Sequence, residues 1–170
     1  MLRLFRGSMV VITLAAAPAL AQQAPQVPAG APLPPFEAEL AAGGGWFLDD
    51  EAIGHSLVGA AARWHLTPRL AVGPEWTYWR GPGQDRDLTL TGNVTFFLRR
   101  GGLTPFFVGG AGLFRHSDQF AGRVESSTEG GVTLGGGLRV PFAQGWYLAP
   151  EWRMGWEPHM RVHVAIGRRF

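Results

Sequence analysis

The segment Leu88-Thr-Leu-Thr-Gly-Asn-Val-Thr-Phe-Phe-Leu98 alternates between apolar and polar side chains along nearly its whole length. Successive side chains of a β-strand point to opposite faces, so this period of two predicts a strand with one apolar face and one polar face. The apolar face holds Leu88, Leu90, Gly92, Val94, Phe96 and Leu98, and the polar face holds Thr89, Thr91, Asn93 and Thr95. The segment matches the ~9–11 residues that a tilted strand needs to cross a bilayer and exceeds the ~5–6 of an average soluble strand.

The same alternation recurs in further segments, and no segment after residue 36 has a helical stripe. The predicted strands, of which the segment above belongs to 87–98, are 36–48, 55–65, 69–79, 87–98, 104–115, 129–140, 146–155 and 160–170. Short turns are expected near 66–69, 99–102 and 141–145, and more polar connections near 49–54, 80–86, 116–128 and 156–159. The sequence therefore predicts an all-β fold, an eight-stranded antiparallel up-and-down transmembrane barrel with both termini on the short-turn side.

The apolar set of side chains is expected to face lipid rather than a dry core. The opposite set is very small or charged, rich in Gly and Ala with Glu and Arg, which suits the tight lumen of a small barrel. Outward aromatic residues also fall near strand ends, where membrane barrels carry their aromatic belts. The predicted belts contain Trp46, Trp64, Trp76, Tyr78, Phe96 and Trp146, joined by Phe36, Phe114 and Phe170. The alternative with the apolar set inside is a soluble, periplasmic ligand-binding barrel.

Residues 1–21 have the pattern of a secretory signal peptide. They carry a basic start, a short apolar run and the small-x-small sequence Ala19-Leu20-Ala21, which predicts cleavage before Gln22. The apolar run is too short to span a membrane and is followed at once by Pro18. Residues 22–35 are rich in Pro and Ala and predict a stiff, solvated linker. The expected organisation is a signal peptide at 1–21, a linker at 22–35 and a barrel domain at 36–170, placed in the outer membrane.

Charge and cysteine content exclude several classes of function. The 15 basic residues are all Arg, and without the two in the predicted signal peptide they balance the 13 acidic residues. These Arg residues are spread along the chain rather than clustered, so a nucleic-acid partner is not expected. The absence of Cys removes disulfides, Cys-ligated metals, thiol nucleophiles and a lipoprotein anchor.

Several charged residues point into the lumen by their parity in the predicted strands. The expected lumen charge network is Glu37, Glu39, Arg63, Glu75, Arg139, Glu151, Arg153 and Arg161, with His163 beside it. Charges in a narrow interior are costly unless they pair, so we expect Glu75 and Glu151 to pair with some of Arg139, Arg153 and Arg161. The structural interpretation is a plug of salt bridges, and the functional alternative is a gated polar pore or proton path.

Two prolines fall inside predicted strands. Pro74-Glu75-Trp76 recurs as Pro150-Glu151-Trp152, in the third and seventh strands. Proline cannot donate a hydrogen bond to a sheet and is usually found at strand edges or bulges, so a bulge is expected at each.

Three stretches carry a family resemblance: Leu66-Thr-Pro-Arg69 leading to Pro74-Glu-Trp76, Thr104-Pro-Phe-Phe-Val-Gly-Gly-Ala-Gly112, and Val162-His-Val-Ala-Ile-Gly-Arg-Arg-Phe170. With the signal peptide, they make the chain resemble the small outer-membrane β-barrels of Gram-negative bacteria, the OmpA-like or OmpX-like eight-stranded barrels. The resemblance implies that Phe170 is a signal to the barrel-assembly machinery. Arg168 departs from the family pattern, which usually has an apolar or aromatic residue there.

The resemblance also implies the partners: outer-membrane lipids and lipopolysaccharide around a monomeric barrel, and the assembly machinery during biogenesis. A structural or surface-interaction role is expected, with external contact through the loop 116–128, which carries Asp118, Arg123 and Glu125. A small porin is an alternative. No cofactor and no metal site is expected, since the one regular spacing, His159 with His163, lacks the Glu of a zinc-protease motif.

A lipid-A-modifying enzyme, a deacylase or acyltransferase, is the alternative from another class. The deacylases that resemble this chain in size use a His-x-Ser pair, but the residues two places after each His are Leu57, Thr67, Asp118, Arg161 and Ala165. His55-Ser56 and His116-Ser117 are adjacent, so their side chains point to opposite faces of a strand. No catalytic residue is therefore expected.

Overall fold

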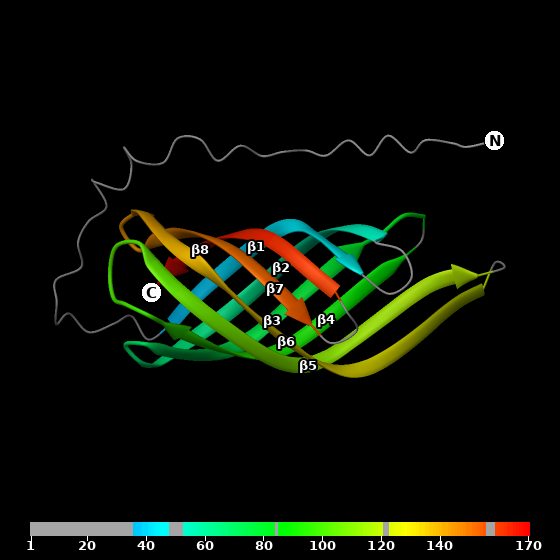
Figure 1. Cartoon of the computed structure of the whole chain (residues 1–170), viewed down its shortest axis with the longest axis horizontal. Coiled ribbons are helices and arrows are strands. Elements are labelled where there is room, and N and C mark those ends of the chain that lie inside the picture. The colour runs from blue at the N-terminus through cyan, green and yellow to red at the C-terminus, as the bar shows by residue number, and fades with distance from the viewer. Residues whose placement is uncertain (1–35, 48–52, 84, 121–122, 156–158) are drawn as a thin grey trace.

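The computed structural model describes residues 36–47, 53–83, 85–120, 123–155 and 159–170. The predicted signal peptide and linker lie outside the described residues. The described chain forms eight antiparallel strands that close into one barrel in sequence order, as the alternation predicted (Figure 1). Their bounds are β1 Phe36–Phe47, β2 Ile53–Thr67, β3 Leu70–Arg80, β4 Arg86–Phe97, β5 Thr104–Phe120, β6 Arg123–Ala143, β7 Trp146–Gly155 and β8 His159–Arg169.

Closure of the barrel comes from pairing of the first strand with the last. Ala42 lies opposite Val164 in β8 and opposite Val58 in β2, so β1 is hydrogen-bonded on both sides. A closed barrel leaves no sheet edge, which a lipid environment requires of its strands. No helix in the described part of the chain is long and apolar enough to cross a membrane.

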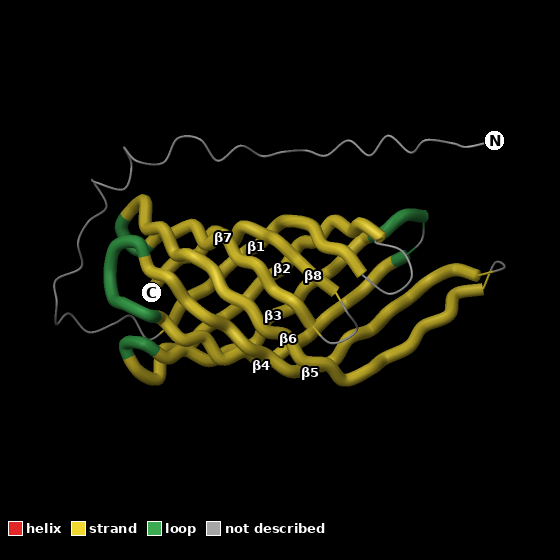
Figure 2. The backbone as a smooth tube through the Cα atoms, viewed as in Figure 1, coloured by secondary structure: helices red, strands yellow, loops and turns green. Residues whose placement is uncertain are grey.

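The barrel has two distinct ends. Tight connections join β2 to β3, β4 to β5 and β6 to β7, and the first and last strand residues lie at that same end, named the turn end here (Figure 2). The opposite end, named the loop end, carries the connection 81–85 and the tip of β5 and β6. This arrangement is the one that the alternation of short and longer connections predicted.

The predicted loop 116–128 is wrong, because most of it is strand. β5 and β6 continue in register from Arg115 opposite Thr128 to Phe120 opposite Arg123. Beyond Ser117, which pairs with Arg86, β5 has only β6 as a neighbour, and the two strands project past the others as a ribbon (Figure 1). Hydrogen bonds between the two strands satisfy the backbone groups of this segment. Its polar composition, taken alone, had indicated a loop.

The expected bulges at the two prolines are also wrong. Pro74 lies opposite Gly92 and Pro150 opposite Val164, both within an unbroken register. The register shifts lie beside turns instead, between His65 and Thr67 and between Pro141 and Ala143. Each proline interrupts the pairing on one side only, so the strand keeps its register through the missing hydrogen bond.

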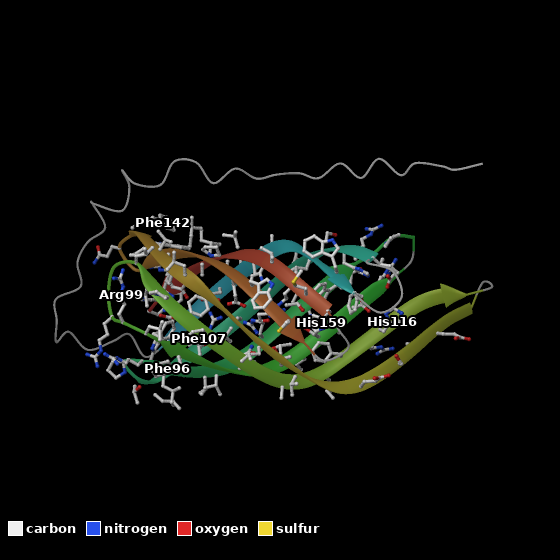
Figure 3. The ribbon with its side chains drawn as sticks, in the orientation of Figure 1. Phe96, Arg99, Phe107, His116, Phe142 and His159 are labelled. Atoms are coloured by element: carbon white, nitrogen blue, oxygen red, sulfur yellow. The ribbon has the colours of Figure 1, made fainter. Side chains whose placement is uncertain are left out.

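The apolar faces point outward along the described strands. Leu90, Val94 and Phe96 alternate as exposed residues with the buried Thr91, Asn93 and Thr95 on β4. Phe96 and Phe107 stand on the outside of the barrel in Figure 3. Exposed Leu, Val and aromatic residues around a buried polar interior are the inverse of a soluble protein, and suit a barrel whose outer wall contacts lipid.

Glycines on the inner face make room for large lumen side chains. Gly135 lies opposite Arg153, and an added Cβ there would overlap the Arg153 side chain and the Trp152 carbonyl oxygen. Gly43 is placed in the same way opposite His163. The inward-facing glycines of these clusters thus leave space for bulky polar residues opposite them, and allow neighbouring strands to approach closely.

Candidate functional site: the charged lumen

Two layers of ion pairs occupy the barrel interior. Four carboxylates and four guanidinium groups are buried among the described residues: Glu37, Glu39, Glu75, Glu151, Arg63, Arg139, Arg153 and Arg161. Each comes from a position that alternates with a lipid-facing residue, so strand parity alone directs it inward. Their formal charges cancel, which is the condition under which charges tolerate burial.

The layer nearer the turn end is centred on Glu37. Arg139 donates from Nη1 to Glu37 Oε1 over 3.0 Å and from Nη2 to Oε2 over 2.7 Å, the bidentate geometry that favours Arg over Lys. The same carboxylate contacts Arg169 Nε at 3.0 Å and His65 Nε2 at 2.9 Å. Glu39 pairs with Arg63 beside it. One carboxylate is therefore held from three directions.

Aromatic rings clamp the guanidinium of this layer. Arg139 Cζ lies 4.3 Å from the centre of the Phe97 ring and 4.1 Å from that of Tyr147. Cation–π contacts gain strength where water is excluded. The Tyr147 hydroxyl group donates to Glu39 Oε1 over 2.7 Å and lies 3.1 Å from Glu37 Oε2. Tyr147 thereby joins the two carboxylates to the ring clamp.

The second layer, in the middle of the barrel, is centred on Arg153. Its Nη2 donates to Glu75 Oε2 over 2.7 Å, its Nε donates to Glu151, and its Nη1 donates to Asn93 Oδ1 over 3.1 Å. Arg161 donates to the other oxygen of Glu75. His163 Nε2 lies 3.5 Å from Glu151. Arg153 is fully buried and bridges strands on opposite sides of the lumen.

Glu75 and Glu151 pair with two of the three candidate arginines. Glu75 and Glu151 do pair with Arg153, and Glu75 with Arg161, but Arg139 pairs with Glu37 and Glu39. The reason is height along the barrel, because Arg139 lies on β6 near the turn end, level with the start of β1. Parity fixes the face of a residue but not its height relative to a distant strand.

The sequence analysis missed the large aromatic residues of the interior. Tyr147, Phe97, Phe106 and Trp79 are almost completely buried inside the barrel. Parity could have found Tyr147, since it alternates with the outward Trp146 and Leu148. Above the charged layers, Trp79 Nε1 donates to Thr77 Oγ1 over 2.8 Å. A pocket beside Glu39, Glu75 and His163 has room for about one water molecule.

The Tyr147 hydroxyl group offers a test of the turn-end layer. Tyr147→Phe removes the hydroxyl group that donates to Glu39 and lies beside Glu37, and keeps the ring over Arg139. A hydrogen bond to a charged group contributes about 1.5–3 kcal/mol, so the free energy of unfolding should fall by about that amount. Urea unfolding in detergent micelles measures this change. Tyr78→Phe is the matched control, and an equal loss there would contradict the assigned role of the Tyr147 hydroxyl group.

The predicted aromatic belt residues have their side chains on the outer wall. Trp46, Trp64, Trp76, Phe96 and Trp146 are exposed, and Tyr78 is half-buried. Phe114 is an exception: it faces inward at the loop end, with its ring 5.5 Å from that of His159. At the turn end, Arg168 lies over the rings of Trp146 and Phe170, which is how a charge is accommodated at the position where the family pattern has an apolar residue.

Comparisons with known proteins give the fold but no sequence relative. No protein-family model matches the chain, and no curated protein matches it. Among solved structures, Neisserial surface protein A matches with a TM-score of 0.72 and 10% identity, over 79% of this chain and 97% of that one. The N-terminal barrel domain of Pseudomonas aeruginosa OprF matches with a TM-score of 0.63 and 14% identity, over 79% and 97%.

A third match is Ail, the attachment invasion locus protein of Yersinia pestis, solved in complex with the heparin analogue sucrose octasulfate. Its TM-score is 0.59 at 14% identity, over 79% of this chain and 99% of that one. At such identities the likeness concerns the fold alone. The chain has the fold of the small eight-stranded outer-membrane barrels, which confirms the fold that its resemblance implied.

Proposed function

We propose that this protein is an integral outer-membrane barrel with a closed lumen, whose role is structural or lies in contacts at the cell surface. The observation that carries the proposal is the combination of a lipid-facing exterior with a lumen filled by paired charges. Leu40, Leu134 and Phe107 are each more than half exposed, while Arg153, Tyr147 and Glu37 are almost fully buried. An eight-stranded barrel is just wide enough for side chains to fill it.

Planar-bilayer recording tests the closed lumen. The wild-type protein should produce no large, steady conductance, because Arg139 and Arg153 each bridge carboxylates within the lumen. Glu75→Ala and Arg139→Ala each remove one side of a layer and should give brief openings. Glu129→Gln, an exposed carboxylate on β6, is the matched control and should stay silent. Large steady pores from the wild type would establish a small porin instead.

Membrane fractionation tests the location. A barrel with an apolar outer wall should stay in the outer-membrane pellet after washing with carbonate or high salt. Release into the supernatant would favour the soluble, periplasmic ligand-binding barrel. The proposal includes export by a cleaved signal peptide, for which N-terminal sequencing of the purified protein should begin at Gln22.

The projecting ribbon is the proposed contact surface. It extends β5 and β6 past the other strands; its residue Glu125 is exposed, as are Arg115 and Glu129 at its base. Rigid scaffolds commonly carry their binding residues on such projections. Deleting residues 117–126 should abolish adhesion to host or neighbouring cells without changing membrane insertion. Unchanged adhesion after this deletion would leave only the structural role.

The positions of four histidines do not favour catalysis on the outer wall. The side chains of His55, His65 and His163 are buried in the interior, and His159 packs on Trp79 and Phe114 there. Ser56 points outward and donates to the Arg80 carbonyl oxygen. A lipid-modifying enzyme needs base and nucleophile together on the outer wall. Fatty-acid release from lipopolysaccharide by the purified protein would restore the enzyme alternative.

A further inference from the structure

Three chelating side chains from separate elements meet at the loop end of the barrel. They are His55 near the start of β2, Asp85 in the connection from β3 to β4, and Asp87 at the start of β4. The His55 imidazole and one carboxylate oxygen from each aspartate lie within 4.8 Å of one another. His55 Nε2 is 2.7 Å from Asp85 Oδ2 and 3.5 Å from Asp87 Oδ2. The lumen charge network does not use any of the three.

We propose that His55, Asp85 and Asp87 bind a divalent transition-metal ion, for which Zn²⁺ is the best match. Imidazole with two carboxylates is a zinc donor set, whereas Ca²⁺ and Mg²⁺ take oxygen ligands. Ligand atoms about 2.0–2.2 Å from a tetrahedral zinc ion lie about 3.3 Å apart. The two distances from His55 Nε2 bracket that separation, so small side-chain movements bring the three atoms to a common ion. Three protein ligands leave the fourth position to water.

The second ring nitrogen of His55 is held as a metal-binding histidine requires. Its Nδ1 lies 3.1 Å from the Ile53 carbonyl oxygen, which can only accept a hydrogen bond. Nδ1 is therefore the nitrogen that donates to this carbonyl group. Nε2 lies 2.7 Å from Asp85 Oδ2, a contact that needs a proton on Nε2, and a metal ion would replace that proton. Histidine ligands in metal sites typically donate their other N–H to such a carbonyl group. The ring also packs edge-on against Phe47, with the ring centres 4.9 Å apart.

Two independent observations point to an occupant among these atoms. Asp87 is almost completely buried, and its Oδ2, the atom facing His55, has no hydrogen-bond partner among the residues that the structure describes. Leaving a buried carboxylate oxygen without a partner is costly, and a cation relieves that cost. In addition, a Cβ at Gly81 would overlap both His55 Nε2 and Asp85 Oδ2, so glycine keeps open the point where these two atoms converge.

The surroundings fix the two carboxylates. His116, on β5 at the base of the ribbon and opposite Asp87, places Nδ1 2.5 Å from Asp87 Oδ1 and 3.7 Å from Asp85 Oδ1. It therefore contacts the oxygens that face away from His55 (Figure 3 labels His116). Gly81 N–H donates to the Asp85 carbonyl oxygen over 3.0 Å, which closes the connection that carries Asp85. A bound ion would link β2, β4 and this connection beneath the ribbon.

Zinc titration of the untagged protein, purified from outer membranes in detergent, tests the site. Calorimetry should show one Zn²⁺ per chain, reversed by a chelator, and Co²⁺ should give the visible absorption of tetrahedral coordination. Asp85→Asn with Asp87→Asn should weaken zinc binding 100-fold or more. Gly81→Ala keeps every ligand but fills the convergence point, and should weaken binding at least 10-fold.

Glu129→Gln is the matched control, because it removes an exposed carboxylate near the same end and should leave zinc affinity unchanged. Electrophoretic mobility of unheated samples reports whether each variant is folded, and His55→Gln replaces any variant that is not. Wild-type affinity no greater than that of the double aspartate variant would overturn the proposal. So would equal binding of Ca²⁺, or a loss in Glu129→Gln as large as in the site variants.

Discussion

Replacing Arg153 by Met should lower the free energy of unfolding by about 3–5 kcal/mol, the cost of removing one partner of a buried ion pair. Arg153 is fully buried and donates to Glu75, Glu151 and Asn93. Met has similar length and packs well, so the lost charge dominates. Glu75 keeps Arg161, but the groups left to pair with Glu151 are His163 at 3.5 Å and the Arg63 guanidinium at 4.0 Å. Glu151 therefore bears most of the loss.

A compensating variant separates electrostatics from packing. Glu151→Gln combined with Arg153→Met removes the unpaired charge and should recover much of the lost stability, since a neutral substitution of both partners is often tolerated. Urea unfolding followed by tryptophan fluorescence measures the stability of Arg153→Met, of the double variant and of the control. Arg115→Met, at an exposed position on β5 at the base of the ribbon, is the matched control and should change stability by less than about 0.5 kcal/mol. A similarly small loss in Arg153→Met would mean that water solvates the lumen.

The strand period was enough to predict the barrel and its inside. Glu75 lies next to the outward Trp76, and Arg153 lies next to the outward Trp152. This alternation lies within a single strand, so it can be recognised without knowing how the strands pair. The partners within the lumen could not be predicted in the same way. The pairing of Arg139 with Glu37 joins the sixth strand to the first, and depends on the tilt of the strands and on how the barrel closes.

The loop end was predicted least well, for a related physical reason. His55 on β2 lies 30 residues before Asp85, and Asp85 and Asp87 are close together in the sequence, but this spacing does not resemble a metal motif. Only the folded connection at 81–85 brings them together. The ribbon was missed because serine, threonine and charged residues at Arg123–Thr128 are typical of loops. They extend β6 because β5 offers a matching partner along its whole length.

The orientation of the apolar face has a consequence that depends on depth in the bilayer. Val164 is half-exposed at the middle of β8, opposite Ala42 and Pro150. An Arg on the lipid face costs about 2–4 kcal/mol at the bilayer midplane and about 0–1 kcal/mol near the interface. Val164→Arg should therefore lower the free energy of unfolding by about 2–4 kcal/mol in phosphatidylcholine vesicles.

Leu98→Arg supplies the control for depth, because Leu98 is similarly exposed but follows β4 at the turn end. Leu98→Arg should lower the free energy of unfolding by no more than about 1 kcal/mol, since a long Arg side chain there reaches the headgroups. Guanidinium unfolding of both variants in the same vesicles gives the difference. In a soluble barrel both positions would face water, and both substitutions would be nearly neutral. Equal small losses of unfolding free energy would therefore exclude a lipid-facing wall. A larger loss at Val164 than at Leu98 requires one, because only a bilayer makes the cost of an Arg depend on depth.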